Sequence, residues 1–352
     1  DRAIEYLERY QKIAPNMNAA RNRVSLYVKQ GLTKEAILEL KGIAAESNSP
    51  LDRISLALFL AREGMIDEAL EQYDLGLDLD AENRFAFDGK LILLATVGRV
   101  EEALEIARKS EMLDARRLMT LEIELFLASG NLEAANQTSN ELLAQFPESI
   151  GTWIILARVR SQLNDLPGAR NALRQALMLD PENVIALGQL LPLLVADTNS
   201  WEEARSLLPR LKNDAPTLAD VLELKMDSSD PVSGTFKPQA DDLARSLQLV
   251  VNYPKTVAPR HLAWTMHSIA GEHQGALRIA REAMINLPSD PNPALWGYES
   301  AVNLQEWDTA LDLAVSGRDR SPSGRRLEHD MRIAELSLNM GRYGVALDAL
   351  LP

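Results

Sequence analysis

The 352-residue chain contains no cysteine, and this absence excludes disulfide bonds and thiolate metal sites. The sequence also lacks any run of about 18 consecutive apolar residues, so no segment is predicted to insert into or span a membrane. An absence of cysteine suits a periplasmic or other envelope location slightly better than the cytoplasm, although cytoplasmic repeat proteins also lack it. The localisation therefore stays unknown at this point.

Sequence patterns that support catalysis are also missing. The 18 glycines lie mainly at regular turns such as Gly64, and they do not form the cluster that cradles phosphate before a helix. The four histidines lack the i, i+4 spacing that directs two imidazoles at one metal ion: His261, His267, His273 and His329. We therefore predict no catalytic residue, no cofactor and no metal site, and we expect that the chain is not an enzyme.

Positive charge is scarce, because 51 acidic residues outnumber 37 Lys and Arg residues and give a formal net charge of -14. A nucleic acid is not expected as a partner, since phosphate binding needs clustered cations. Residues 63–88 hold nine acids and one base, Arg84, which gives a net charge of 1 − 9 = −8. This stretch is interpreted as a solvated helix face, with a docking patch for a basic partner as the alternative.

A repeated sequence pattern runs through the whole chain. Each copy has a turn residue, often Gly, a small residue five positions later, and often a Pro near the end of the copy. The small-residue positions are 32 to 38 residues apart. They fall at Ala3, Ala36, Ala69, Ala103, Ala135, Ala169, Ala204, Asp242, Ala276, Ala310 and Ala346. A period this regular predicts a solenoid of stacked repeats.

Each repeat contains two apolar patterns with helical spacing, as the unit that begins near Ile150 illustrates. Asn164 separates the two patterns, and Asp165 followed by Pro167 predicts the start of the second helix. A small residue such as Ala169 is expected where the two helices cross, because a larger side chain would separate their backbones. The two patterns are carried by Trp153, Leu156 and Ala157, and then by Ala169, Leu173 and Ala176.

These residues resemble the tetratricopeptide repeat family, which has a 34-residue helix-turn-helix unit. The resemblance covers about ten degenerate repeats and is strongest in residues 153–183, 64–83 and 271–288. The family's Trp occurs only at Trp153, and its first-helix Gly is replaced in the copies by Ala157, Leu191 or Trp264. The resemblance implies an all-α, right-handed superhelical solenoid of antiparallel helix pairs.

The repeat register breaks once, between Ala204 and Asp242. We expect an N-terminal block over residues 1–216, an irregular repeat over 217–254 with an inserted loop at 227–239, and a C-terminal block over 255–352. Pro192 and Pro209 are expected to kink the two helices before the loop. The break is interpreted as sequence drift, with a hinge or a protruding contact loop as the alternative.

The resemblance also implies a concave wall lined by the first helix of each repeat. The residues at the family's wall positions are candidates for partner binding: Asn18, Arg21, Ser25, Lys29, Arg62, Phe85, Asp88, Glu124, Arg158, Gln162, His261, Thr265, Glu299 and Asn303. Apolar and small residues share these positions, namely Leu51, Ile54, Leu58, Ile92, Thr120, Ile154 and Leu295. Arg21 and Lys29 are expected to be able to hold a carboxylate together. The family's chaperone-tail clamp is not expected, because Ser25, Ser55 and Gly89 stand where it needs amide or cationic side chains.

Three functions follow as hypotheses. The first is a non-catalytic scaffold that binds an extended peptide or a helix of a partner protein in the groove. The second is a periplasmic scaffold of a bacterial polysaccharide-export or secretion assembly, and the third is the regulatory arm of an enzyme whose catalytic domain lies outside this segment. We expect the sequence to be an excised piece whose ends expose apolar helix faces, so that end-to-end self-association is also possible.

Overall fold

The computed structural model describes residues 17–29, 32–111, 113–288, 290–321 and 326–350. Within these ranges it contains twenty α-helices, α2 to α21, and one short 3-10 helix, η1 (Thr198–Ser200). The described residues form no β-strand, and their one β-feature is an isolated bridge between Ser229 and Phe236. The predicted all-α class is confirmed.

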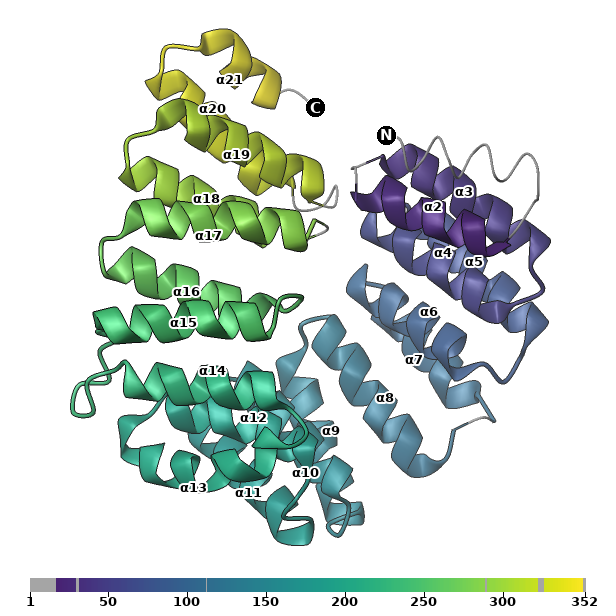
Figure 1. The fold of residues 1–352 in the computed structure, drawn as a ribbon. Coiled ribbons are helices and arrows are strands. Elements are labelled where there is room, and N and C mark those ends of the chain that lie inside the picture. Colours follow the sequence, from purple (N-terminus) through teal and green to yellow (C-terminus); the bar gives the residue numbers. More distant parts are fainter. Residues whose placement is uncertain (1–16, 30–31, 112, 289, 322–325, 351–352) are drawn as a thin grey trace. The chain divides into compact units, whose positions relative to one another are not determined.

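The helices alternate between a first and a second helix of each repeat (Figure 1). The first helices are α2 (Met17–Lys29), α4 (Pro50–Arg62), α6 (Arg84–Thr96), α8 (Ala115–Ala128), α10 (Ile150–Gln162), α12 (Val184–Val195), α14 (Pro216–Asp227), α16 (Val257–Ile269), α18 (Asn292–Asn303) and α20 (Arg326–Asn339). The second helices are α3 (Thr33–Glu46), α5 (Ile66–Leu79), α7 (Val100–Lys109), α9 (Leu132–Gln145), α11 (Leu166–Leu179), α13 (Trp201–Lys212), α15 (Ala240–Asn252), α17 (His273–Asn286), α19 (Trp307–Arg320) and α21 (Tyr343–Leu350).

Two compact units contain these helices. One unit comprises the residues up to Lys90 together with those from Gly271 onward, and the other comprises Leu91–Ala270. The boundary at Lys90 falls inside α6. Both units are built from the same kind of helix pair, so each can be described by its own repeats.

The turns inside the repeats explain the regular glycines. Gly64, Gly98, Gly130, Gly271 and Gly341 all have φ between 72° and 86°, a conformation that glycine adopts without a steric penalty. Asn164 and Gln305 take the same left-handed conformation at the corresponding turns, with φ of 61° and 59°. Gly31 lies outside the described residues. The expectation that these glycines mark the ends of first helices is confirmed where the structure describes them.

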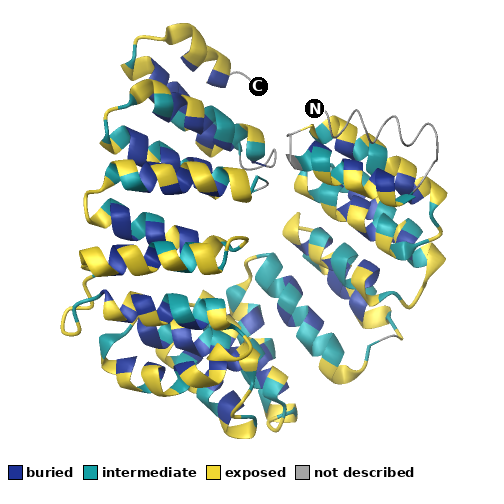
Figure 2. Ribbon diagram, viewed as in Figure 1, coloured by how far each residue is buried: buried dark blue, intermediate teal, exposed yellow. Residues whose placement is uncertain are grey.

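The small residues of the repeated pattern are buried in the helix pairs. Figure 2 shows buried positions in dark blue along the helices. The small residues with no exposed surface are Ala36, Ala69, Ala103, Ala135, Ala169, Ala204, Ala276 and Ala310. Ala346 is almost completely buried, and Ala3 lies outside the described residues. Asp242 is buried as well, and its carboxylate accepts a hydrogen bond of 2.9 Å from the backbone N–H of Gln239, which caps α15. The periodic position is therefore buried in the helix pairs, as the expectation of a small residue at the helix crossing requires.

The two internal prolines lie in helices that continue past them. Pro192 lies inside α12 and Pro209 inside α13, and each helix ends three residues after its proline. Both prolines are exposed. Proline has no backbone N–H, so each of these helices lacks one hydrogen bond in its last turn. Water can hydrogen-bond the carbonyl that is left without a partner near the helix end.

The inserted loop follows α14 and is folded against neighbouring structure. Its ends are joined by the bridge between Ser229 and Phe236 and by a hydrogen bond of 2.9 Å from Lys237 N to Ser228 O. The Phe236 ring packs against the buried cluster of Leu224, Leu243, Leu262 and Met266. At the tip, the pKa of the Asp230 carboxyl is lowered, because Ser233 donates backbone and side-chain hydrogen bonds to it and Val232 adds another. Residues 228–239 are not helical, as expected, whereas Asp227, which was placed in the loop, is the last residue of α14.

Phe236 is expected to control access of proteases to this loop. Replacing Phe236 with Ala removes the anchor, and we expect cleavage between residues 231 and 235 to become about tenfold faster, as an opening cheaper by about 1.4 kcal/mol would produce. Limited proteolysis followed by mass spectrometry measures the rate. The matched control is Val232→Ala at the exposed tip, which should leave the rate unchanged. Equal rates in wild type and Phe236→Ala would show that the ring does not hold the loop closed.

Candidate functional site

The first helices expose the same face in successive repeats. In α4 this face carries Leu51, Ser55, Leu58 and Arg62, which follow one another at helical spacings of three and four residues. The exposed fractions are 60% for Leu51 and 58% for Leu58, and in α6 Phe85 is 74% exposed. Large apolar side chains are therefore left in water at positions that the repeats have in common.

The structure places most candidate residues on this face. The exposed candidates are Asn18, Arg21, Ser25, Arg62, Phe85, Arg158, Gln162, His261, Glu299 and Asn303. Asp88, Glu124 and Thr265 are half-buried, and the side chain of Lys29 lies outside what the structure describes. Ile54 is buried with 7% exposure, so the expectation that it lines the wall is wrong. It packs inside its helix pair, and Ser55 is the exposed residue of that turn.

Charged side chains on this face are joined to neighbouring first helices. The Arg21 guanidinium in α2 donates hydrogen bonds to both carboxylate oxygens of Asp52 in α4, at 2.8 and 3.1 Å from Nη2. Arg158 in α10 pairs with Glu124 in α8 at 3.4 Å. Because Arg21 is already engaged by Asp52, a partner's carboxylate would have to displace Asp52. The side chain of Lys29 lies outside the described residues, so the expectation that Arg21 and Lys29 hold a carboxylate together stays a prediction.

An aromatic side chain joins one other pair of first helices, α18 and α20, and a second aromatic contact lies within α16. The Arg332 guanidinium of α20 lies over the Tyr298 ring of α18, 5.9 Å from the ring centroid. The pKa of Tyr298 is raised, because burial disfavours the phenolate and Glu335 repels it. In α16 the His261 ring stacks on Trp264, with centroids 5.8 Å apart. The pKa of His261 is lowered by partial desolvation and then by the positive charge of Lys225 in α14.

His329 in α20 is expected to make the stability of the last repeats sensitive to pH. The pKa of its buried imidazole is lowered by desolvation and by Arg332, against the opposing charges of Glu328 and Asp330. The folded state therefore keeps the ring neutral while the unfolded chain takes up a proton below about pH 6.5, so stability should fall as the pH decreases from 7 to 5.

The variant His329→Gln tests this expectation, because its side chain does not titrate. Denaturant unfolding at a series of pH values should give a weaker pH dependence for the variant than for the wild type over this window. The same slope in both proteins would show that His329 does not contribute to it.

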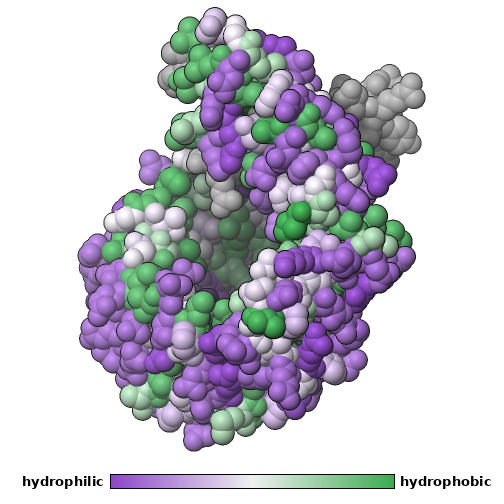
Figure 3. All heavy atoms as spheres, turned by 90° about the vertical axis from the view of Figure 1, so that its left-hand side faces the viewer, coloured by the Kyte–Doolittle hydropathy of each residue, from purple (hydrophilic) through white to green (hydrophobic). Residues whose placement is uncertain are grey.

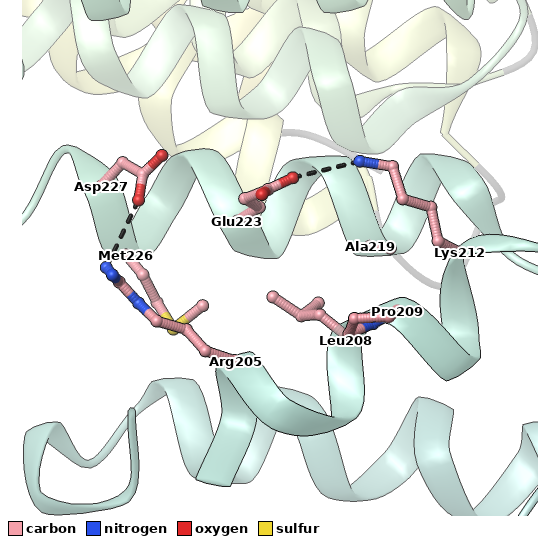
Figure 4. Close-up of a pocket in the computed structure, with 8 residues that line it drawn as sticks. All are labelled: Arg205, Leu208, Pro209, Lys212, Ala219, Glu223, Met226 and Asp227. Atoms are coloured by element: carbon pink, nitrogen blue, oxygen red, sulfur yellow. Dashed lines mark hydrogen bonds and ion pairs between the residues drawn. The ribbon is translucent and has the colours of Figure 1, made fainter. Parts of the chain in front are cut away.

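A cleft of about 300 Å³ lies between α13 and α14 (Figure 4). Its floor is apolar, with Leu208 from α13 and Met226 from α14. Its charged rim is paired internally: Arg205 with Asp227 at 3.3 Å, and Lys212 with Glu223 at 3.3 Å. The pKa of Lys212 is raised by its hydrogen bonds to Asp220 and Glu223. These side chains therefore serve to join α13 to α14.

The described residues hold neither a cluster of metal-binding side chains nor a membrane-spanning helix. No group of three or more His, Asp or Glu side chains converges there as a metal site would require. In the same ranges, no helix combines the length and the apolar character that crossing a lipid bilayer demands. The geometry that is present is a series of exposed helix faces suited to contact with another macromolecule.

Comparison with protein families matches the chain to the tetratricopeptide repeat over residues 126–191, from the end of α8 into α12. The same helix pair with its buried small residue recurs on both sides of the matched segment. Residues 126–191 are therefore a tetratricopeptide repeat segment. A tetratricopeptide repeat-containing protein of Pseudomonas aeruginosa is 31% identical to the chain over 134 residues, which cover 36% of this chain and 23% of that relative. The chain thus spans about a quarter of the length of the curated relative that it matches.

Solved structures similar to this chain share little sequence with it. A tetratricopeptide repeat protein from Parabacteroides merdae is 12% identical, covers 83% of this chain and 100% of its own, and has a TM-score of 0.48. PilW, described as a type IV pilus biogenesis factor, is 14% identical, covers 68% of this chain and 100% of its own, and has a TM-score of 0.45.

The sequence missed the side-chain pairs that link neighbouring first helices. Arg21 with Asp52 and Arg158 with Glu124 are 31 and 34 residues apart, close to one repeat. This spacing is a usable signal, since residues one repeat apart occupy similar positions on adjacent first helices. Opposite charges at such a separation predict a pair across a tetratricopeptide repeat interface.

Proposed function

We propose that this chain is a non-catalytic scaffold that binds an extended segment or a helix of a partner protein on the exposed face of its first helices. The observation that carries the proposal is the exposure of Leu51, Leu58 and Phe85 at the family's wall positions. Exposed apolar side chains that recur on one face are typical of surfaces that another protein covers.

The spacing of these side chains suits a partner segment with regularly spaced apolar residues. Leu51 and Leu58 are two helical turns apart, which places them about 10 Å from each other along α4. A partner helix with apolar residues seven positions apart has the same spacing, as does an extended segment with apolar residues about three positions apart. Ser55 and Arg62 lie between and beyond the leucines and supply polar contacts that fix the register.

Site-specific photocrosslinking in the native host tests the proposal. The crosslinker p-benzoylphenylalanine replaces Phe85 in the full-length protein, and in a matched control it replaces Met178, which is 74% exposed on the second helix α11. We expect a discrete protein adduct from position 85 and none from position 178. Adducts of equal yield at both positions, or none at position 85, would count against the first-helix face.

The two other hypotheses from the sequence concern the context of this scaffold. An envelope assembly predicts a signal peptide in the complete gene, whereas an enzyme's regulatory arm predicts a catalytic domain there. Sequencing the complete gene separates these hypotheses from a free-standing adaptor. End-to-end self-association also stays a prediction, and light scattering that gives a strict monomer at all concentrations would remove it.

A further inference from the structure

A second surface that could bind a ligand lies between the second helices α17 and α19. A cleft of about 510 Å³ runs between them and is lined by Arg281, Met284 and Ile285 from α17 and by Asp312, Leu313 and Arg320 from α19. The cleft involves the second helices, so it is separate from the first-helix face proposed above. Its size is sufficient for a few residues of a bound segment.

The floor of this cleft is apolar and well fixed. Leu313 is buried and lies directly on α18, because a Cβ at Gly297 would be only 3.2 Å from both of its δ carbons. Met284 packs against the same buried cluster. Ile285 stands beside this floor and is 78% exposed. The cleft therefore has a fixed apolar floor, and Ile285 beside the floor is exposed to solvent.

The arginines of this cleft make fewer ion pairs with described residues than the cations between α13 and α14 do. Arg320 Nη1 donates hydrogen bonds to the carbonyls of Met284 at 3.1 Å and Pro288 at 3.3 Å, which holds the guanidinium at the end of α17. Its Nε and Nη2 atoms donate no hydrogen bond to any described residue, and neither Arg320 nor Arg281 has an ion pair within the described ranges. The pKa of Arg320 is lowered because burial removes water from the guanidinium, with Asp290 opposing that effect.

We propose that the cleft between α17 and α19 docks an acidic segment of a protein partner. An aliphatic or aromatic side chain of that segment covers Met284, Ile285 and Leu313, and an adjacent Asp or Glu carboxylate accepts hydrogen bonds from Arg320 Nε and Nη2. Arg281 adds a second positive charge one helical turn before Met284, so the lining holds two arginines and one acid, Asp312, while Asp290 acts on Arg320 from outside the lining. Since the chain as a whole carries a charge of -14, these arginines are the local feature that favours an acidic ligand.

A blocked peptide is the probe for this site. It has Leu and Phe between two Glu residues, an acetylated N-terminus and an amidated C-terminus, so its only carboxylates are side chains. Methyl NMR of the isotope-labelled full chain should show saturable shifts at Met284 and Ile285. The same peptide with Gln in place of both Glu residues should bind about tenfold more weakly, because the charge-assisted hydrogen bonds are lost.

Protein variants separate specific docking from general charge effects. Arg281→Gln should weaken binding about fivefold, and Ile285→Glu should abolish it; both residues are exposed, so folding is not at risk. The matched control is Arg278→Gln, an exposed arginine of the same helix that does not line the cleft, and it should bind as the wild type does.

Several results would overturn the proposal. They are no saturable shift at Met284, equal binding of the Glu and Gln peptides, and an equal loss with Arg278→Gln. Shifts at Met284 and Ile285 caused by inorganic phosphate or by phosphatidylglycerol vesicles, but not by the peptide, would assign the cleft to another ligand. None of these outcomes bears on the first-helix face, whose test reports on position 85.

Discussion

Replacing Gly317 with Ala is expected to lower the free energy of unfolding by about 2 kcal/mol. A Cβ at Gly317 of α19 would lie 2.6 Å from the His329 ring and 3.4 Å from the Cβ of Ala294. His329 is buried, so its ring cannot move away freely. Overpacking of this kind costs about 3 kcal/mol, and the better helix propensity of alanine recovers about 1 kcal/mol.

The same substitution at Gly42 provides the control. Gly42 lies inside α3 on an exposed turn, and a Cβ there would meet nothing within 4 Å. Gly42→Ala should therefore raise the free energy of unfolding by about 1 kcal/mol. Denaturant unfolding of both variants measures the difference, and effects of the same sign would contradict the packing described for α18, α19 and α20.

Replacing Phe85 with Glu is expected to weaken binding of the partner segment about a hundredfold. The ring is 74% exposed, so its removal costs little folding stability, whereas burying a carboxylate under an apolar ligand is strongly unfavourable. A loss of about 2.7 kcal/mol corresponds to this factor. Titration calorimetry with the segment recovered by crosslinking measures it.

The matched control for Phe85→Glu is Met178→Glu, which introduces the same charge at an equally exposed residue of a second helix. It should bind the segment with wild-type affinity. A loss of binding in both variants would show that added negative charge, rather than the loss of an apolar contact on α6, weakens the complex.

The sequence was sufficient to predict the architecture because the same packing residues recur in every repeat. The small residue at positions such as Ala69 and Ala276 has no exposed surface, since any larger side chain there would separate the two helices. Glycine at Gly64 and its equivalents is explained by a left-handed turn. Each signal recurs every 32 to 38 residues, so substitutions in one repeat did not hide the pattern.

Details that depend on contacts between distant residues were beyond the sequence. Family positions placed Ile54 on the exposed face, but an adjacent position on a helix is rotated by about 100°, and Ser55 is the exposed one. The packing of Phe236 on α14, α15 and α16 could not be predicted, because an irregular loop has no periodic pattern of apolar residues. The sequence did not show that Arg21 forms an ion pair with Asp52 on the neighbouring first helix.

The exposure of the candidate residues could be predicted from the sequence, and their use in partner binding stays a prediction. Most wall positions taken from the family are exposed, as a shared helix geometry requires. Pairing among charged residues was not predictable, because it depends on side-chain conformations across neighbouring helices. That Arg281 and Arg320 have no ion pair among the described residues likewise becomes apparent only when their surroundings are known.

The central claim, that the first-helix face is the binding surface, is tested most directly by fluorine NMR of Phe85. The chain contains six phenylalanines, and uniform labelling with 4-fluorophenylalanine gives each its own signal, which Phe85→Leu assigns. On addition of the crosslinked segment, the Phe85 signal should shift and lose its sensitivity to replacing H2O with D2O. An unchanged, solvent-sensitive Phe85 signal in the saturated complex would contradict the claim.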